Sequence, residues 1–265
     1  MKIQGKVIWI TGASSGIGEA LAVELFKAGA TVILTARNEK KLNELKVKLD
    51  DIEQGRCHVA VCDVTQQKAI DQALEKVKQL VDRVDILVNN AGVSQRSYVL
   101  ETEIAVYREL LEVNFFSAVA VTKGLLPWMI SKGGGQIVVI SSITGKYGFR
   151  MRSGYAAAKH ALHGFFETLR AELHDKHVGV TMICPGRVQT DVSVHSLTGD
   201  GRQYGKMDKG QAEGVPVERC ARIILRAIKC NRKEVFIGFG ERFLLVVKRV
   251  CPPLFYWIVN RASPT

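Results

Sequence analysis

The strongest constraint on the fold is a regular alternation between short apolar runs and longer amphipathic patterns. Seven runs predict strands, at 6–10, 31–35, 57–62, 85–89, 135–141, 178–184 and 234–239. Helical patterns separate them, at 16–28, 39–49, 66–80, 102–131, 153–176 and 216–230. Most strand runs are continuously apolar, as in strands covered on both faces, and strands joined through helices pair in parallel. The sequence therefore predicts an α/β fold, a doubly wound, mainly parallel seven-stranded sheet with helices on both faces.

We expect one domain over the whole chain, 1–265. Its residues are 47% apolar and contain no repeat or low-complexity linker, so they can bury one sizeable core. The regular alternation of strands and helices occupies residues 1–186. The polar segment 187–215 follows a predicted strand, where a long irregular excursion is uncommon unless it is functional, and we expect it to form a mobile substrate lid. Residues 240–265 form an apolar and basic tail.

Three features favour a cytoplasmic protein. The first apolar run begins almost at the amino terminus, with no room for a signal peptide before it. No run of about 18 uninterrupted apolar residues predicts a membrane-spanning helix. The six cysteines form no C-x-x-C pair and no metal-ligand spacing. We therefore expect them to be small core residues in a reducing compartment, without disulfides or a metal site.

The net charge of +11 is unevenly placed. Residues 216–265 contain ten Lys and Arg residues against three Glu residues. Such a surface suits nucleic acid, an anionic membrane or an anionic cofactor, and a solvated basic face explains it equally well. The sequence carries no nucleic-acid recognition module, so we exclude nucleic acid as a partner.

The first predicted strand runs into TGASSGIG, residues 11–18, and then into a helix. Gly12, Gly16 and Gly18 would let the backbone turn tightly, approach a pyrophosphate and start the helix close to the strand. A glycine triplet alone is weak evidence and also suits a structural turn. Its position between a first strand and a first helix predicts a Rossmann-type dinucleotide site.

The end of the second predicted strand distinguishes NADP from NAD. An acidic residue there would bind the ribose 2′-hydroxyl of NAD. The sequence has Ala36 followed by Arg37 instead. With no carboxylate to repel a 2′-phosphate and a guanidinium to bind it, we expect NADP(H) as the cofactor. An arginine that is merely exposed to solvent is the alternative.

Tyr155 and Lys159 lie four residues apart in a predicted helix. Side chains at that spacing are neighbours on a helix, although chance supplies such pairs too. Reduction of a ketone leaves an alkoxide that needs a proton, which a phenol with a pKa of about 10 can give. An ammonium about 4–6 Å away favours the phenolate, so we expect Lys159 to lower the pKa of Tyr155. Ser142 ends the preceding strand and can polarise the same oxygen.

These motifs occur in a known order. The chain resembles the short-chain dehydrogenase/reductase (SDR) family along almost its whole length, through TGASSGIG, CDVT (62–65), NNAG (89–92), Asn114, ISS (140–142), YAAAK (155–159) and CPGRVQT (184–190). Each motif alone is weak, whereas the set in this order is highly specific. Segment 190–208 resembles more narrowly the member 7/7B branch of that family, which is related to lipid- and steroid-handling carbonyl reductases.

The resemblance implies four catalytic residues. Ser142 would hydrogen-bond the substrate carbonyl, and Tyr155 would transfer the proton. Asn114 would hold a water that relays protons. Lys159 would bind the nicotinamide ribose and lower the pKa of Tyr155.

The resemblance also implies the cofactor contacts. The pyrophosphate and adjoining ribose would meet the glycine-rich loop, at Gly12, Ser14, Ser15, Gly16, Ile17 and Gly18. The adenine and its ribose would meet the ends of the next strands, at Asp63, Val64, Asn90, Ala91 and Gly92. The nicotinamide would be bordered by Pro185, Gly186, Val188 and Thr190.

Two positions depart from the usual family pattern. Arg187 stands where many relatives carry an apolar or aromatic residue. It could favour an anionic substrate group, touch the cofactor phosphates or simply lie on the surface. Cys184 stands where Asn or Ser is common, and we interpret it as a packing residue.

The lid and the tail favour a bulky lipophilic substrate. The lid region offers apolar side chains that either contact substrate or pack, at Val93, Val192, Val194, Leu197, Tyr204 and Met207. The tail combines the apolar runs 243–247 and 254–259 with basic residues, which is typical of a segment in a membrane interface. We expect peripheral membrane contact through 240–260, and packing on the core or on a second subunit is the alternative.

Together these features predict an NADP(H)-dependent oxidoreductase that interconverts a carbonyl and an alcohol on a lipid-, retinoid- or steroid-like substrate. A 3-oxoacyl thioester reductase is one alternative, although the tail lacks the short glycine-rich ending of those enzymes. A non-catalytic NADP-binding scaffold is another, although it would need none of the four catalytic residues. The resemblance also implies a homodimer or tetramer through the helices near 102–131 and 153–176. Apolar surface for it would come from Phe115, Phe116, Phe165 and Phe166, which core packing explains equally well.

Overall fold

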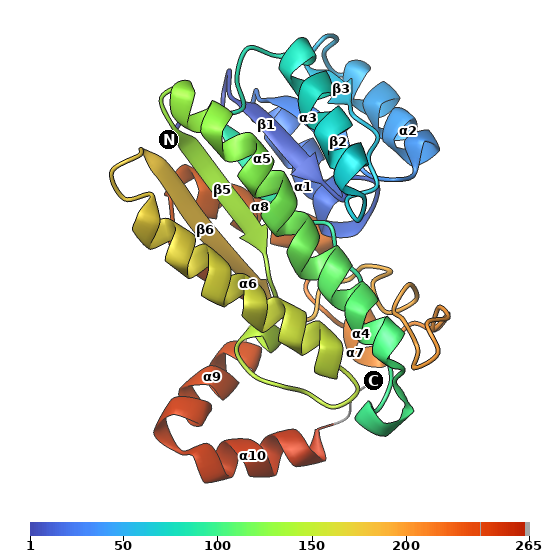
Figure 1. The fold of residues 1–265 in the computed structure, drawn as a ribbon. Helices are drawn as coiled ribbons and strands as arrows, with labels where there is room; N and C mark the ends of the chain where they lie inside the picture. The colour runs from blue at the N-terminus through green and yellow to red at the C-terminus, as the bar shows by residue number, and fades with distance from the viewer. Residues whose placement is uncertain (239, 263–265) are drawn as a thin grey trace.

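The computed structural model describes residues 1–238 and 240–262, and of Glu241 the backbone only. Its centre is a sheet of seven parallel strands in the order β3-β2-β1-β4-β5-β6-β7 (Figure 1). The strands are β1 Val7–Thr11, β2 Thr31–Thr35, β3 Cys57–Val59, β4 Ile86–Asn89, β5 Gly135–Ile140, β6 Val178–Pro185 and β7 Glu234–Ile237. The predicted doubly wound sheet is confirmed, and it is entirely parallel.

The helices cover both faces of this sheet. Those on one face are α1 Gly16–Lys27, α2 Glu39–Asp50 and α8 Val217–Lys229. Those on the other are α3 Gln67–Leu80, α4 Ile104–Leu111, α5 Ser117–Ser131 and α6 Ser153–Glu172. A short helix, α7 Lys209–Ala212, lies in the lid, and the tail forms α9 Gly240–Val250 and α10 Pro252–Arg261. Short turns are Val99–Glu101 and Ile143–Gly145, both 3-10, and the π-helical Glu112–Phe116.

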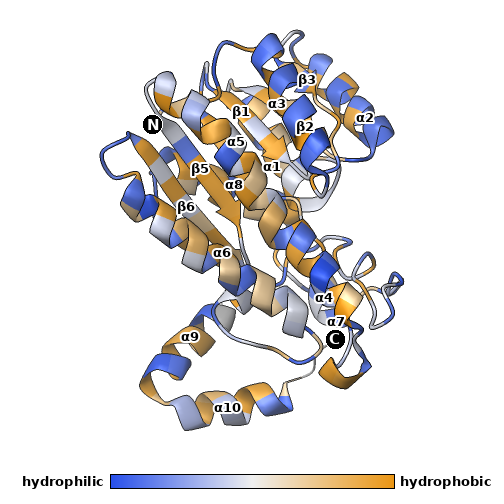
Figure 2. Cartoon of the chain, in the orientation of Figure 1, coloured by the Kyte–Doolittle hydropathy of each residue, from blue (hydrophilic) through white to orange (hydrophobic). Residues whose placement is uncertain are grey.

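Two apolar layers explain why the strands are continuously apolar. Successive residues of a strand point to opposite faces, so Ile8 and Ile10 pack with α1 and α8 while Trp9 packs with α3, α5 and α6. Figure 2 shows the strands as largely hydrophobic and the outer faces of the helices as hydrophilic. Trp9 is fully buried, and its indole N–H donates to Thr35 Oγ1 at 2.8 Å, which satisfies its polar atom.

The predicted elements are found with small shifts at their ends. The third strand ends at Val59, although the amides of Ala60 and Cys62 still donate to the carbonyls of Leu34 and Ala36. The last strand ends at Ile237, and the predicted Phe239 lies outside the described residues. The predicted helix 102–131 is one helical run, Ile104–Ser131, with a π-helical turn in its middle. The tail, for which we expected only an amphipathic segment, contains two helices.

By length and composition, one helix in the described part of the chain could cross a membrane, the run Ile104–Ser131. This run contains polar residues, so it is not the uninterrupted apolar run of about 18 residues that would predict a membrane-spanning helix from the sequence. Single polar residues interrupt the apolar run in this helix, but its mean hydropathy stays high. In this fold the run packs against α3 and α6, and Leu110, Val121 and Leu125 are buried.

Candidate active site

The predicted site residues gather where the sheet order reverses. β1 and β4 are neighbours here, and the chain leaves them towards opposite faces of the sheet, which opens a crevice at their carboxyl ends. Asn90 ties the two ends together, because its side-chain Nδ2 donates to the carbonyls of Thr11 and Gly12, each at 3.0 Å. Thr11 Oγ1 accepts from the amides of Asn90 and Ala91 at 3.0 and 3.2 Å. We had not singled out this hydroxyl, although it opens the TGASSGIG motif.

The glycine-rich loop has the shape that a pyrophosphate requires. Gly12 and Gly16 have positive φ angles of 66° and 57°, which favour glycine. A Cβ on Gly18 would lie 2.3 Å from the carbonyl oxygen of Gly12, so only glycine lets α1 start this close to β1. Ser15 is the N-cap of α1 and makes no side-chain capping bond. The first amides of α1 are therefore available to an anion. The residues of this loop fit a dinucleotide.

The adenine end of the predicted site is formed by the ends of β2 and β3. Ala36 is buried directly after β2, and the exposed Arg37 follows it. Asp63 Oδ1 accepts from the Thr65 amide at 3.0 Å and from its hydroxyl at 2.8 Å, which fixes the turn that holds the buried Val64. This carboxylate is thereby already bonded within its own turn.

Asn114 lies in the π-helical turn between α4 and α5, a feature often found at functional sites. Its side-chain Nδ2 donates to the carbonyls of Val93 and Leu110, both at 2.9 Å, and its Oδ1 accepts from the Val93 amide at 3.2 Å. Both ends of the amide thus fix the loop after β4. A Cβ on Gly92 would lie 2.7 Å from Asn114 Oδ1 and 3.5 Å from Lys159 Nζ. Gly92 is therefore what allows these two side chains to approach each other.

Ser142, Tyr155 and Lys159 meet at the carboxyl end of β5. Lys159 Nζ donates to the carbonyl of Ile140 at 2.9 Å and lies 5.6 Å from the centre of the Tyr155 ring. Ser142 Oγ accepts from the Thr144 amide at 3.2 Å and donates to the Pro185 carbonyl at 3.4 Å. Ser142 also hydrogen-bonds the Tyr155 hydroxyl. The structure thus brings the predicted serine and tyrosine together at one point.

The pKa of Tyr155 does not shift in the direction that we expected. Burial raises the pKa of the Tyr155 hydroxyl, and the smaller opposite effects come from the Ser142 hydrogen bond and from Arg96 rather than from Lys159. Burial also lowers the pKa of Lys159 to about 8. Both shifts have one cause, because a site with little water disfavours the charged form of each group. In the structure Tyr155 is therefore a phenol at neutral pH.

The predicted nicotinamide border follows β6. The Gly186 amide donates to the Ile237 carbonyl at 2.7 Å, and Val188 is buried. Thr190 comes close to the phosphate loop, since a Cβ on Gly16 would lie 3.3 Å from Thr190 Cγ2. Pro185, Gly186, Val188 and Thr190 thus run from the Ser142 side of the site to the phosphate side.

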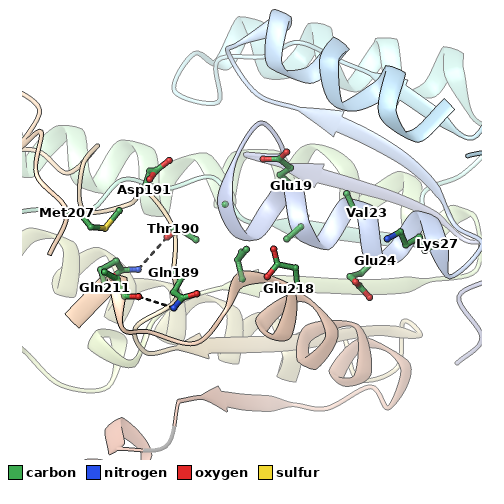
Figure 3. Close-up of a pocket in the computed structure, with 14 residues that line it drawn as sticks. Glu19, Val23, Glu24, Lys27, Gln189, Thr190, Asp191, Met207, Gln211 and Glu218 are labelled. Carbon is green, nitrogen blue, oxygen red and sulfur yellow. Dashed lines mark hydrogen bonds between the residues drawn. The ribbon is translucent and has the colours of Figure 1, made fainter. Parts of the chain in front are cut away.

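A cavity of about 730 Å³ lies beside the phosphate loop, between α1, the lid and the start of α8 (Figure 3). Gly16 and Thr190 line it together with acidic side chains, at Glu19, Glu24, Asp191 and Glu218. Ser142, Tyr155 and Lys159 are not among its lining residues. This cavity therefore lies beside the glycine-rich loop and not beside Tyr155. Its acidic lining does not suit a lipophilic substrate.

Comparison with known proteins decides the family. The family model described as short chain dehydrogenase matches residues 6–200. Dehydrogenase/reductase SDR family member 7B of Xenopus laevis is 38% identical over 264 residues, which cover 97% of this chain and 82% of that protein. The chain belongs to the short-chain dehydrogenase/reductase family. The predicted family and its narrower member 7/7B branch are confirmed.

Solved structures agree with the SDR fold. A short-chain dehydrogenase from Streptomyces avermitilis is 30% identical, with a TM-score of 0.81, and the match covers 96% of this chain and 97% of that one. SDR structures from Burkholderia phymatum and Burkholderia cenocepacia were solved with NAD and NADP. They share the fold at 22% and 23% identity, with TM-scores of 0.84 and 0.82 over 99% or more of each chain. The SDR family is one of oxidoreductases that use nicotinamide cofactors.

In this SDR the lid is docked on the loop after β4. The Arg96 amide donates to the Leu197 carbonyl at 2.8 Å, and the Leu197 amide donates to the Ser94 carbonyl at 2.9 Å. Leu197 is buried with Val106 and Leu110, and Val93 packs against them. Of the apolar side chains expected to meet substrate, Leu197 and Val93 therefore pack within the protein. Met207 is exposed, whereas Val192, Val194 and Tyr204 are partly buried.

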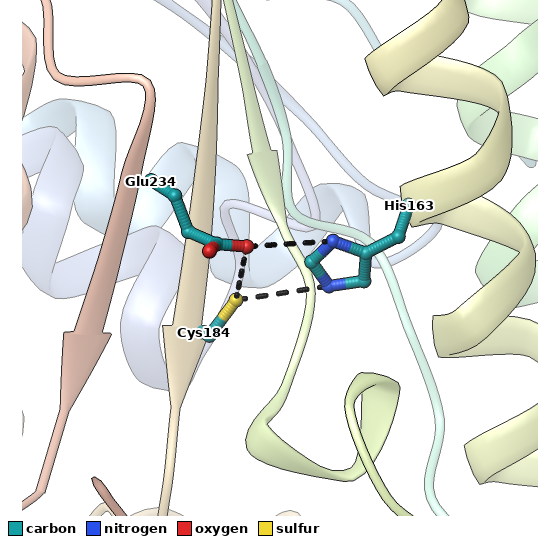
Figure 4. Close-up of side chains that lie close together, drawn as sticks. All are labelled: His163, Cys184 and Glu234. Atoms are coloured by element: carbon teal, nitrogen blue, oxygen red, sulfur yellow. Dashed lines mark hydrogen bonds and ion pairs between the residues drawn. The ribbon is translucent and has the colours of Figure 1, made fainter. Parts of the chain in front are cut away.

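A polar cluster lies behind Lys159, between α6, β6 and β7 (Figure 4). His163 Nε2 lies 3.0 Å from Ser141 Oγ and 3.7 Å from Cys184 Sγ, and Glu234 Oε1 is 3.6 Å from His163 Nδ1. Lys146 Nζ is 2.7 Å from Glu234, so the carboxylate already has a cationic partner. Burial lowers the pKa of His163 and raises that of Cys184. The cluster joins side chains from three elements, so no spacing within the sequence indicated it. Cys184, which we interpreted as a packing residue, also makes a polar contact with His163.

The tail helices of this SDR pack beside the loop that follows Ser142. Val247, Phe255 and Val259 are buried against Ile143 and Tyr147, which lie in the segment after Ser142. Lys248 Nζ donates to the Lys146 carbonyl at 2.7 Å. The opposite side of the two helices stays exposed, at Phe243, Val246, Val250, Leu254, Tyr256 and Trp257. Figure 1 shows α9 and α10 at the end of the molecule to which the β5 arrow points. One face of the tail thus packs on the core, which was the alternative to membrane contact, and the other face is exposed.

Proposed function

We propose that this SDR is an NADP(H)-dependent oxidoreductase that interconverts a carbonyl and an alcohol on a lipophilic substrate. The observation that carries the proposal is the meeting of Ser142, Tyr155 and Lys159 at the carboxyl end of β5. The Ser142–Tyr155 hydrogen bond joins two of them, and Lys159 stands beside the tyrosine ring. The glycine-rich loop with its free helix amides supplies a dinucleotide cradle in the same crevice.

In this mechanism the protein binds the substrate oxygen and supplies its proton. NADPH, when bound, supplies the hydride that reduces the carbonyl carbon. Ser142 donates a hydrogen bond to the carbonyl oxygen and so favours the charge that develops there. Tyr155, kept protonated by its raised pKa, gives its proton to that oxygen. The ammonium of Lys159 stabilises the phenolate until a proton returns from solvent.

The preference for NADP over NAD is attributed to Arg37. This guanidinium is exposed directly after β2. The residue before it is Ala36 rather than an acidic residue, so no carboxylate there repels a 2′-phosphate. The relay water expected at Asn114 remains part of the proposal. The two N–H donors of the Asn114 side chain are used by the carbonyls of Val93 and Leu110, and its Oδ1 accepts one bond from the Val93 amide, which leaves one lone pair of that oxygen for the water.

The tail supports a lipophilic substrate delivered from a membrane surface. Phe243, Val246, Val250 and Trp257 are each more than half exposed. Basic side chains lie beside them, at Arg242, Lys248, Arg249 and Arg261. Apolar side chains flanked by cations bind the interface of an anionic bilayer. Because the buried side of the tail touches the segment after Ser142, we infer that the bilayer lies on the Ser142 side of the site. All six cysteines are free thiols, which fits a reducing compartment such as the cytoplasm.

Vesicle binding tests this surface. A Phe243→Ser/Trp257→Ser double variant should lose most of its co-sedimentation with vesicles containing phosphatidylserine, and its fold should be unchanged because both side chains are exposed. Leu100→Ser is the matched control, because Leu100 is 99% exposed but lies far from the tail in sequence. Equal vesicle binding by the double variant and the control would rule out the membrane surface.

We also propose a homodimer or tetramer through α4, α5 and α6. Phe116 is 50% exposed and stacks against Phe115 with ring centres 5.0 Å apart, so apolar surface is present there. Phe166 is fully buried and belongs to the core. Sedimentation equilibrium of the wild type and of Phe116→Glu tests the contact. A lower mass for the variant is expected, and an unchanged oligomer would exclude this surface.

Consumption of NADPH with a panel of carbonyl compounds tests the function itself. The panel contains retinoid, steroid, fatty-aldehyde, ketolipid and 3-oxoacyl thioester substrates. Turnover of one of the first four is expected. Turnover of the thioesters alone would instead favour the thioester reductase, and NADPH binding without turnover of any of them would favour a scaffold.

A further inference from the structure

The first turn of α6, which carries Tyr155, has no cap of its own. Arg152 occupies the N-cap position and makes no side-chain capping bond. Gln95, 60 residues earlier, takes that role: its Oε1 accepts from the amide of Gly154 at 2.8 Å and from that of Tyr155 at 3.3 Å. Gln95 is fully buried. A side chain from the loop after β4 therefore holds two amides in the first turn of α6, that of Tyr155 included.

The neighbour of Gln95 is held by the lid. Arg96 Nε donates to Asp208 Oδ2 at 2.7 Å, Arg96 Nη2 donates to the same oxygen, and the two side chains are 1% and 4% exposed. Arg96 Nη1 donates to Ser94 Oγ at 3.1 Å and to the Gln95 carbonyl at 2.7 Å. Asp208 is the N-cap residue of α7 in the lid, 112 residues from Arg96. A buried ion pair is weak evidence for stability, because desolvation costs about as much as the attraction gains. Its position is the more informative feature.

Arg152 closes the connection from the other side. Its Nη1 donates to the Gln95 carbonyl at 2.9 Å, and its Nη2 lies 3.4 Å from Asp208 Oδ2. The lid, the loop after β4 and the start of α6 thus form one hydrogen-bonded unit. We propose that this unit, built from Gln95, Arg96 and Asp208, couples the lid to the catalytic end of α6 and so sets the position of Tyr155.

The three residues are positioning residues, since they act through Tyr155. The coupling rests on the proposed function only in assigning the proton transfer to Tyr155. The charges near this end of α6 are Arg96 and Asp208, Arg152 before the helix, and Lys159 within it; Lys146, His163 and Glu234 lie behind Lys159. The Arg96 charge opposes the effect of burial on the Tyr155 hydroxyl. The unit therefore influences the acidity of Tyr155 as well as its position.

Amide hydrogen exchange tests the coupling without any turnover. In Asp208→Asn the amides of Gly154 and Tyr155 should exchange at least about ten-fold faster, because the loop that caps them is no longer held. The matched control is Asp200→Asn, which breaks an exposed ion pair with Arg202 in the same lid and should change nothing at α6. Asp208→Asn leaves Arg96 as an unpaired buried charge, which can unfold the protein. An Arg96→Met/Asp208→Leu double variant removes both charges, so the exchange measurement can be made on it even if the single variant does not fold.

Variants of Gln95 separate positioning from general damage. Gln95→Leu should lower kcat for carbonyl reduction by about 10- to 100-fold with little change in KM for NADPH, because a small misplacement of the proton donor is costly. Gln95→Glu keeps the acceptor for both amides and should restore most of the rate, but with the tyrosine titration moved to higher pH. Unchanged exchange at 154–155 in both the Asp208→Asn protein and the double variant would overturn the coupling. A Tyr155→Phe protein that still turns over would overturn the proposed function and leave the coupling standing.

Discussion

Lys159 Nζ lies 5.6 Å from the centre of the Tyr155 ring and donates its hydrogen bond to the Ile140 carbonyl. The lysine is 3% exposed, so it sits in the wall of the site as a charge without much water around it. Its pKa, lowered by burial to about 8, lies within the range in which enzymes are assayed. The titration of Lys159 should therefore be visible in the pH dependence of the reaction.

The rate of carbonyl reduction should fall as the pH rises through about 8. Above that pH Lys159 loses the proton that stabilises the Tyr155 phenolate, since its pKa is about 8. Lys159→Arg should work more slowly but lack this decline, because a guanidinium keeps its charge to a pH above about 12. Profiles of kcat/KM against pH for the two proteins check this. The same decline in both would assign it to another group.

His163 should make the fold less stable in acid. Burial holds its folded pKa below the usual 6.5, so the unfolded chain binds more protons below that pH. Stability is therefore fully present above pH 6.5 and is lost as the pH falls from 6.5 towards the lower folded pKa. Urea unfolding at pH 7 and pH 5 should show a larger loss for the wild type than for His163→Gln. Equal losses would mean that His163 does not contribute.

Two glycine variants should change stability in opposite directions. Gly18→Ala would place its Cβ 2.3 Å from the Gly12 carbonyl oxygen, and we expect a loss of about 1–3 kcal/mol and weaker NADPH binding. Gly164→Ala is exposed in the middle of α6 with nothing within 4 Å of the new Cβ, and we expect a gain of about 0.5–1 kcal/mol. Thermal unfolding with and without NADPH checks both. A Gly18→Ala protein as stable as the wild type would show that the phosphate loop can move away.

Arg37→Asp should reverse part of the preference for NADPH. A hydrogen bond to a charged group contributes about 1.5–3 kcal/mol, so the ratio of kcat/KM for NADPH over NADH should fall by about 10- to 100-fold. Lys40→Asp is the matched control, because it makes the same charge change at an exposed position three residues away. An equal fall in both variants would indicate a general field effect rather than a 2′-phosphate contact.

The sequence was sufficient where a structural requirement is local. β1 and β6 are covered on both faces, so their apolar runs are continuous and easily found. The glycine-rich loop and the Tyr155–Lys159 spacing each lie within one strand–helix connection or one helix. The tail also carried a usable signal, since Pro252 and Pro253 start α10 at positions where helices accept proline.

What the sequence did not indicate depends on distant partners. Arg96 and Asp208 are 112 residues apart, and His163, Cys184 and Glu234 come from three different elements. No periodicity marks such pairs before the fold is known. The direction of the Tyr155 pKa shift was also wrong, because the Tyr–Lys spacing indicates a neighbouring charge but not the burial that raises the pKa.

Proton transfer from Tyr155 is tested by the initial rate of NADPH oxidation by Tyr155→Phe with the best substrate of the panel. The matched control is Tyr98→Phe, which removes a hydroxyl from a tyrosine that is 46% exposed in the same loop region as Gln95. Loss of a general acid costs about 100- to 10,000-fold, so Tyr155→Phe should lose at least that much activity while Tyr98→Phe keeps the wild-type rate. Wild-type turnover by a folded Tyr155→Phe protein that binds NADPH would contradict the account.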